Sequence, residues 1–168
     1  MKDLFDDNGA TFSPCRKYRY VLWRIWDDSK PKVMFIGLNP STANETEPDP
    51  TITRVIGFAK SWGYGGVYMT NCFPYVSTNP DDLKDFGNTA TNDHWLYEVA
   101  RMSKDIIFAW GAFDVVKELG RDVELKGMFP HAKALVINKD GSPRHPLYVK
   151  GDVKPVAYNF ISTPSGKS

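Results

Sequence analysis

The chain has 168 residues, of which 42% are hydrophobic and 14% aromatic, and its formal net charge is +1. This length suits one domain with a sizeable core, and so small a charge argues against a protein that coats nucleic acid through bulk electrostatics. The N-terminal residues lack an apolar signal core, and no run of about 18 apolar residues occurs. We therefore expect a cytoplasmic monomer without a membrane partner, with one domain over residues 1–160 and a disordered tail over 161–168.

The first third of the chain predicts two strands after an irregular lead-in over residues 1–15. Residues 18–26, YRYVLWRIW, alternate apolar with basic side chains, which is typical of a half-buried strand. Residues 32–38 form a short and nearly continuous apolar run, which indicates a strand buried on both faces. The segment GLNPSTA then begins a loop that extends to Pro50.

A helix follows this loop. Asp49 is a suitable N-cap, Pro50 suits the first helical position, and apolar residues recur at helical spacing before Gly63 ends the helix. Further along, the patterns predict strands over 67–71, 105–110 and 133–137, and helices over 92–102 and 113–119.

This alternation of strands and helices predicts the fold class α/β. We expect a three-layer α/β/α sandwich whose mostly parallel central sheet has about four strands. Ligands of such sheets bind at the carboxyl ends of the strands. Those ends carry Asn39-Pro40, Asn71, Trp110-Gly111 and, one loop further on, His145-Pro146.

Each of these residues has an ordinary structural explanation when it is taken alone. Asn39, Pro40 and Asn71 are common turn residues, and a lone loop histidine such as His145 is usually solvated. Together, however, two amides and an imidazole make a polar site, for which Phe73, Tyr75 or Tyr148 could supply aromatic walls. An amide presents a donor beside an acceptor, as the edge of a nucleobase requires, so the site suits a flat heterocycle.

Other kinds of site have weaker support. The chain contains no phosphate loop, nucleophile elbow, zinc-binding helix or dinucleotide-binding fingerprint. Its three histidines stand in separate segments, and Cys15 and Cys72 are too few for a disulfide framework or a four-cysteine metal site. We expect reduced thiols, no metal and no cofactor.

The strand ends resemble the uracil-DNA glycosylase superfamily over roughly residues 32–150. Its members carry a Gly-x-Asn-Pro loop, a strand ending in Asn, a strand ending in Trp-Gly and a final loop beginning His-Pro, and this chain has these features in the same order. A narrower resemblance, through GLNPSTA, TN-x-F and G-x-P-x-HPLY, is to a set of bacterial and phage proteins without an assigned activity. The superfamily resemblance implies a uracil-DNA glycosylase-like fold and excision of uracil or another modified base from DNA.

The resemblance also implies roles for individual residues. Asn39 would position the attacking water and His145 would stabilise the leaving base, while Asn71 would bind the base edge. The base pocket would also include Leu38, Ser41 and Phe73. Contacts to DNA would come from Leu147, as a wedge beside the flipped base, and from Arg144 and Lys150.

Several features depart from the superfamily pattern or allow another role. Ser41 follows Pro40 where a glycine is common, and Tyr148 stands where a small residue is usual. Asp49 is an alternative activator of water, although its position before Pro50 favours a helix cap. The basic residues near the last loop, Lys139, Arg144, Lys150 and Lys154, form either a phosphate-binding rim or a solvated loop.

Three functions are consistent with these observations. The leading hypothesis is a hydrolase that excises a base from single- or double-stranded DNA. A non-catalytic module that binds a nucleobase or modified DNA would have the same pocket. So would an enzyme that acts on free nucleosides or nucleotides.

Overall fold

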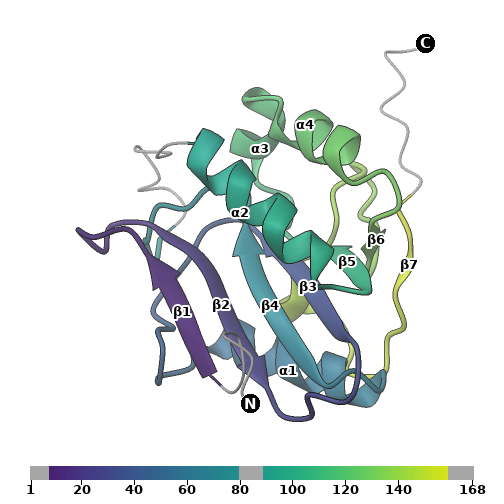
Figure 1. The fold of residues 1–168 in the computed structure, drawn as a ribbon. Coiled ribbons are helices and arrows are strands. Elements are labelled where there is room, and N and C mark those ends of the chain that lie inside the picture. Colours follow the sequence, from purple (N-terminus) through teal and green to yellow (C-terminus); the bar gives the residue numbers. More distant parts are fainter. Residues whose placement is uncertain (1–7, 80–88, 159–168) are drawn as a thin grey trace.

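The structure is a computed structural model that describes residues 8–79 and 89–158 (Figure 1). The expected tail over 161–168 lies outside these ranges. Seven strands form one sheet in the order β1-β2-β4-β3-β5-β6-β7. The strands are β1 (Asn8–Phe12), β2 (Arg19–Ile25), β3 (Lys32–Gly37), β4 (Gly66–Asn71), β5 (Asp105–Phe108), β6 (Lys133–Ala134) and β7 (Val156–Ala157).

Four α-helices and one 3₁₀ turn accompany the sheet in the described parts of the chain. The elements are α1 (Pro50–Ser61), α2 (Thr89–Arg101), α3 (Asp114–Glu118), α4 (Arg121–Met128) and the turn η2 (Pro146–Tyr148). Helix α1 covers one face of the sheet, and α2, α3 and α4 cover the other (Figure 1). The hydrophobic core is accordingly divided into two clusters by the sheet.

The predicted fold class, a mostly parallel sheet of about four strands, is wrong. The sheet is mixed, because β1–β2, β2–β4 and β6–β7 pair antiparallel whereas β3–β4, β3–β5 and β5–β6 pair parallel. The class is therefore α+β. The prediction failed because β1 and β7 are short edge strands with weak patterns, and because the direction in which β2 joins β4 depends on a contact distant in sequence.

Several single elements also differ from the prediction. The lead-in contains β1, and α4, η2 and β7 were not expected. The strands predicted over 105–110 and 133–137 end earlier, at Phe108 and Ala134. Helix α4 has a weak apolar pattern, since only Arg121 and Leu125 are buried in it.

Strand β2 is not half-buried as expected, because its basic residues point inward. Arg19 and Arg24 are only 3% and 6% exposed. Phe12 pairs with Arg19 and Thr11 with Val21, so Tyr20 is an extra residue in a β-bulge. A bulge shifts the alternation of side chains by one residue, and it directs Arg19 to the sheet face to which Arg24 already points.

Helix α1 begins as its sequence predicts. Asp49 has extended backbone, and its Oδ1 accepts a hydrogen bond of 2.9 Å from the backbone N–H of Ile52. Its second oxygen, Oδ2, accepts from the backbone N–H of Ala43 at 3.2 Å. One carboxylate therefore caps the helix and fixes the loop that precedes it.

Replacing Asp49 with alanine should lower the free energy of unfolding by about 2 kcal/mol or more. The loss combines a helix cap, worth about 1 kcal/mol, with a buried Ala43 N–H left without a partner, which costs about 1–3 kcal/mol. Asp49→Asn keeps one acceptor oxygen and should cost less. Urea denaturation measures these differences.

Glu118→Ala is the matched control, because Glu118 is an exposed acidic residue on α3. A surface change of this kind should alter stability by no more than about 0.5 kcal/mol. If Asp49→Ala were as mild as Glu118→Ala, the two roles assigned to Asp49 would be incorrect.

Candidate functional site

A cavity of about 330 Å³ opens where β3 and β4 end. The last residues of these strands, Gly37 and Asn71, are paired in register, so the loops that follow both leave the same edge of the sheet. The cavity is lined by residues from several segments distant in sequence, including Arg19, Asn39, Asp49, Asn71 and His145. The structure thus brings together Asn39, Asn71 and His145, as the sequence predicts.

The side chain of Asn39 is fixed by its own amide nitrogen. Nδ2 lies 3.1 Å from the carbonyl oxygens of Pro40 and Tyr75 and 3.0 Å from that of Ser77. Three acceptors around one atom identify it as the nitrogen, which leaves Oδ1 as the acceptor available to the cavity. No described residue donates to Oδ1.

Asn71 presents a buried amide without a protein partner. It is 2% exposed, and no residue in the described part of the chain bonds to its Nδ2. A buried donor without an acceptor costs about 1–3 kcal/mol, so such an atom in a cavity wall indicates a ligand or water partner. Gly37 permits this placement, because a Cβ there would lie 2.9 Å from Oδ1 of Asn71.

Two buried side chains that the sequence analysis missed hold the end of β4 in place. Nδ2 of Asn92 donates to the carbonyl oxygens of Asn71 and Cys72 at 2.9 and 3.3 Å. Nε of Arg121 donates to the same Cys72 carbonyl at 3.0 Å, and the guanidinium also pairs with Asp93. No local pattern identifies these contacts, since α2 and α4 reach the strand end only through the tertiary fold.

His145 is held as a neutral imidazole with a defined tautomer. Its Nδ1 accepts a hydrogen bond from the backbone N–H of Leu147 at 3.2 Å, so the proton lies on Nε2. Burial lowers the pKa of His145, and the nearby charge of Asp49 opposes this shift only in part. Gly111 lies beside His145 with a φ of +81°, which favours glycine, and a Cβ there would lie 3.1 Å from the ring of Phe113.

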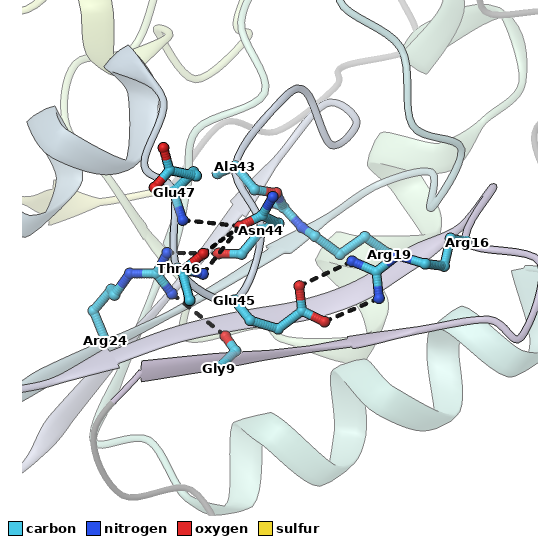
Figure 2. Close-up of polar contacts among 9 residues, drawn as sticks. All are labelled: Gly9, Arg16, Arg19, Arg24, Ala43, Asn44, Glu45, Thr46 and Glu47. Carbon is cyan, nitrogen blue, oxygen red and sulfur yellow. Dashed lines mark hydrogen bonds and ion pairs between the residues drawn. The ribbon is translucent and has the colours of Figure 1, made fainter.

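Arg19 is the main residue of the cavity that sequence reasoning missed. The bulge in β2 directs it to the loop over 43–47, where Nη1 donates to the Ala43 carbonyl at 3.0 Å. Figure 2 shows this loop held also by Arg24, which donates to the Asn44 carbonyl, and by Arg16, which pairs with Glu45. Burial lowers the pKa of Arg19 to about 10, against the opposing effect of Asp49, so the guanidinium remains charged at neutral pH.

The remaining predicted residues are divided between the cavity and other places. Leu38, Ser41 and Leu147 line the cavity, whereas Phe73 is buried in the hydrophobic core on the other face of the sheet from α1. Phe113 and Tyr148 supply the aromatic surface instead. Two of the residues predicted to contact DNA, Arg144 and Lys150, do not line the cavity.

Asp49 and Arg144 have structural contacts that account for their positions. Both carboxylate oxygens of Asp49 already accept backbone N–H groups. Nε of Arg144 donates to Oδ1 of Asn138 at 2.7 Å, which braces the final loop. Lys150 is exposed.

Two kinds of feature are absent from the described ranges. Residues 8–79 and 89–158 contain no cluster of three or more histidine, cysteine or acidic side chains suited to a metal ion. Within the same ranges, no helix has the length and apolar character needed to cross a membrane. Both described cysteines are free thiols, and burial raises the pKa of Cys72.

Comparison with known proteins relates the chain to a family of unknown function. The family described as "Protein of unknown function (DUF1643)" matches residues 19–147. No curated protein and no solved structure matches the chain. The matched range begins at Arg19 and includes every cavity residue named above except Tyr148.

His145 should titrate below the ordinary histidine value of about 6.5. Because the pKa of His145 is lower in the folded state, His145 of the unfolded chain is protonated first as the pH falls. The contribution of His145 to stability is therefore complete above about pH 6.5 and is lost as the pH falls toward the folded-state pKa. NMR titration of the ring carbons and nitrogens, assigned with His145→Gln, measures both the pKa and the tautomer.

A pKa for His145 above about 6.5, or a proton on Nδ1 in the neutral ring, would contradict this account of the imidazole.

Proposed function

We propose that this chain, which belongs to the DUF1643 family of proteins of unknown function, is a hydrolase that excises uracil or another modified base from DNA. The observation that carries the proposal is the convergence of Asn39, Asn71 and His145 on one cavity, each with a polar atom available for a ligand. The cavity is within the size range of small-molecule sites, about 300–1,000 Å³. A base flipped out of the helix would occupy it.

Asn71 is suited to bind the edge of the base. Its amide offers a donor and an acceptor side by side, and neither atom is bonded to a described residue. The amide of Asn71 is buried and fixed at the end of β4, so its donor and acceptor gain hydrogen bonds when a base with a complementary edge enters the cavity. This favours bases whose edge combines a carbonyl oxygen with an N–H.

Asn39 is suited to hold the attacking water. Its Oδ1 would accept a hydrogen bond from the water while the three contacts of Nδ2 keep the amide from rotating. As the bond between C1′ and the base nitrogen breaks, its electron pair leaves with the base and the sugar becomes oxocarbenium-like. Water then attacks C1′, loses a proton to solvent, and the departed base takes up a proton.

His145 is suited to stabilise the departing base. A neutral imidazole with its proton on Nε2 can donate to an oxygen or nitrogen of the base as negative charge develops there. A donor fixed in this way contributes about 3 kcal/mol to the transition state. The lowered pKa keeps the ring neutral, and a neutral ring still donates one hydrogen bond.

The rim of the cavity favours a polymeric substrate. Leu147 and Tyr148 are 45% and 76% exposed beside the opening, where they could contact the part of a substrate that lies outside the cavity. A second, open groove shares Asp49, Pro50 and Leu147 with the cavity and is lined by Arg54. DNA could follow this groove, with Leu147 as the wedge and Lys150 or Arg144 near phosphate; we propose a cytoplasmic monomer in this role.

The test is base release from oligonucleotides that contain uracil, hypoxanthine, xanthine or a 5-substituted pyrimidine, in single and double strands. Abasic sites are detected by strand cleavage in alkali. Asn39→Ala and His145→Gln should each lower the single-turnover rate by at least about tenfold, which corresponds to about 1.4 kcal/mol. His131→Gln is the matched control and should retain the wild-type rate.

The outcomes distinguish the alternatives. Binding of modified DNA without release of any base would indicate a non-catalytic module, and release only from free nucleosides or nucleotides would indicate a small-molecule enzyme. Activity that survives both Asn39→Ala and His145→Gln would mean that these residues do not have the proposed roles.

A further inference from the structure

Arg19 is a buried cation with most of its donors unused. The residue is 3% exposed, yet only Nη1 has a partner, the Ala43 carbonyl. Its Nε is buried without a partner, and no described residue bonds to Nη2. Such groups are rarely buried without compensation, because the transfer of an unpaired donor from water is costly.

The other two buried arginines show how this protein ordinarily satisfies such a group. Arg121 pairs with the carboxylates of Asp93 and Glu124. Arg24 donates to the backbone carbonyls of Trp23 and Asn44 and more weakly to that of Gly9. Arg19, which lines the cavity, is the one whose acceptors are missing among the described residues. We therefore expect its acceptors to come from the ligand.

Arg19 and Asn71 both line the cavity, and they lie on the same face of the sheet, at the start of β2 and at the end of the adjacent strand β4. Leu22 of β2 pairs with Met69 of β4, and Asn71 follows Met69 on the same face of the sheet. The bulge at Tyr20 brings Arg19 to that face as well, one step beyond Leu22. Two of the buried polar atoms without a partner, Nε of Arg19 and Nδ2 of Asn71, thus belong to adjacent strands.

The free edge of the Arg19 guanidinium defines the shape of its ligand. Nε–H and one N–H of Nη2 point in parallel, so they match two neighbouring acceptors in one plane. Among nucleobase edges, O6 and N7 of a 6-oxopurine have this arrangement, whereas adenine places an amino donor beside N7, and uracil and thymine have no unprotonated ring nitrogen beside a carbonyl oxygen. Cytosine also has two neighbouring acceptors, O2 and N3, but in a nucleotide the nitrogen on the other side of its O2 is the glycosidic N1, which has no hydrogen for Oδ1 of Asn71.

We infer that the cavity selects a 6-oxopurine such as hypoxanthine or xanthine, with Arg19 donating to O6 and N7. This inference rests on the proposed function and narrows its substrate class. Asn71 completes the recognition, since Nδ2 can donate to O6 while Oδ1 accepts from N1–H. In adenine, the amino group at C6 would face the donors of Arg19 and Asn71, and N1, which carries no hydrogen, would face Oδ1 of Asn71. Donation to N7 also stabilises the base as the bond between C1′ and N9 breaks.

The test measures binding of free bases by calorimetry, which does not require catalysis. Hypoxanthine should bind at least about tenfold more tightly than adenine or 7-deazahypoxanthine, a discrimination typical of a bidentate arginine contact. Arg19→Lys keeps the charge but loses the fork. It should weaken hypoxanthine binding by about tenfold and leave 7-deazahypoxanthine almost unchanged.

Arg24→Lys is the matched control, because Arg24 is buried in the same strand and holds the same loop but does not line the cavity. It should leave the preference for hypoxanthine intact; thermal melting shows whether either variant is unfolded. Equal binding of all bases would overturn the inference. Equal binding of inosine 5′-monophosphate and adenosine 5′-monophosphate, without binding of hypoxanthine, would also overturn it and would assign Arg19 to a phosphate.

The two proposals fail in different ways. Tight binding of hypoxanthine without base release from any oligonucleotide would refute the glycosidase activity and support the selectivity. Excision of uracil alone, with no binding of hypoxanthine, would support the activity and refute the selectivity.

Discussion

The parallel pairing of β3 with β4 is the constraint from which the cavity follows. The two strands end in register at Gly37 and Asn71, so the GLNPSTA loop and the loop after Asn71 start side by side. Because Gly37 has no side chain, the amide of Asn71 can lie against the backbone of β3. The carboxylate of Asp49 then fixes the loop and the start of α1 together, which gives the cavity a rigid wall.

Polar groups in this wall are buried before any ligand arrives. Nδ2 of Asn71 and Nε of Arg19 both lack a partner among the described residues, whereas the guanidinium groups of Arg24 and Arg121 are bonded to backbone carbonyls and carboxylates of the fold. A protein bears this cost where a ligand later provides the acceptors, and preorganised donors of this kind give specificity against a ligand that cannot accept. The neutral imidazole of His145 adds a third donor to the same cavity.

The sequence predicted those parts of the site that depend on local patterns. The apolar run that ends at Gly37, the Asp49-Pro50 start of α1 and the strand that ends at Asn71 all carry signals within a few residues. Arg19 could not be identified in this way, because its direction depends on a bulge at Tyr20 and its contact is a carbonyl 24 residues away. Phe73 was misplaced because the chain leaves β4 after Asn71, so strand alternation no longer predicts its direction.

The central claim is that the unpaired donors of Arg19 and Asn71 meet a ligand in this cavity. The most direct measurement follows their side-chain N–H signals by NMR while hypoxanthine is added to the protein. The account predicts that the Nε–H signal of Arg19 and the Nδ2 signals of Asn71 shift together with one saturation curve, while the Nδ2 signals of Asn92 stay nearly constant. Saturable binding that leaves the signals of Arg19 and Asn71 unchanged would contradict it.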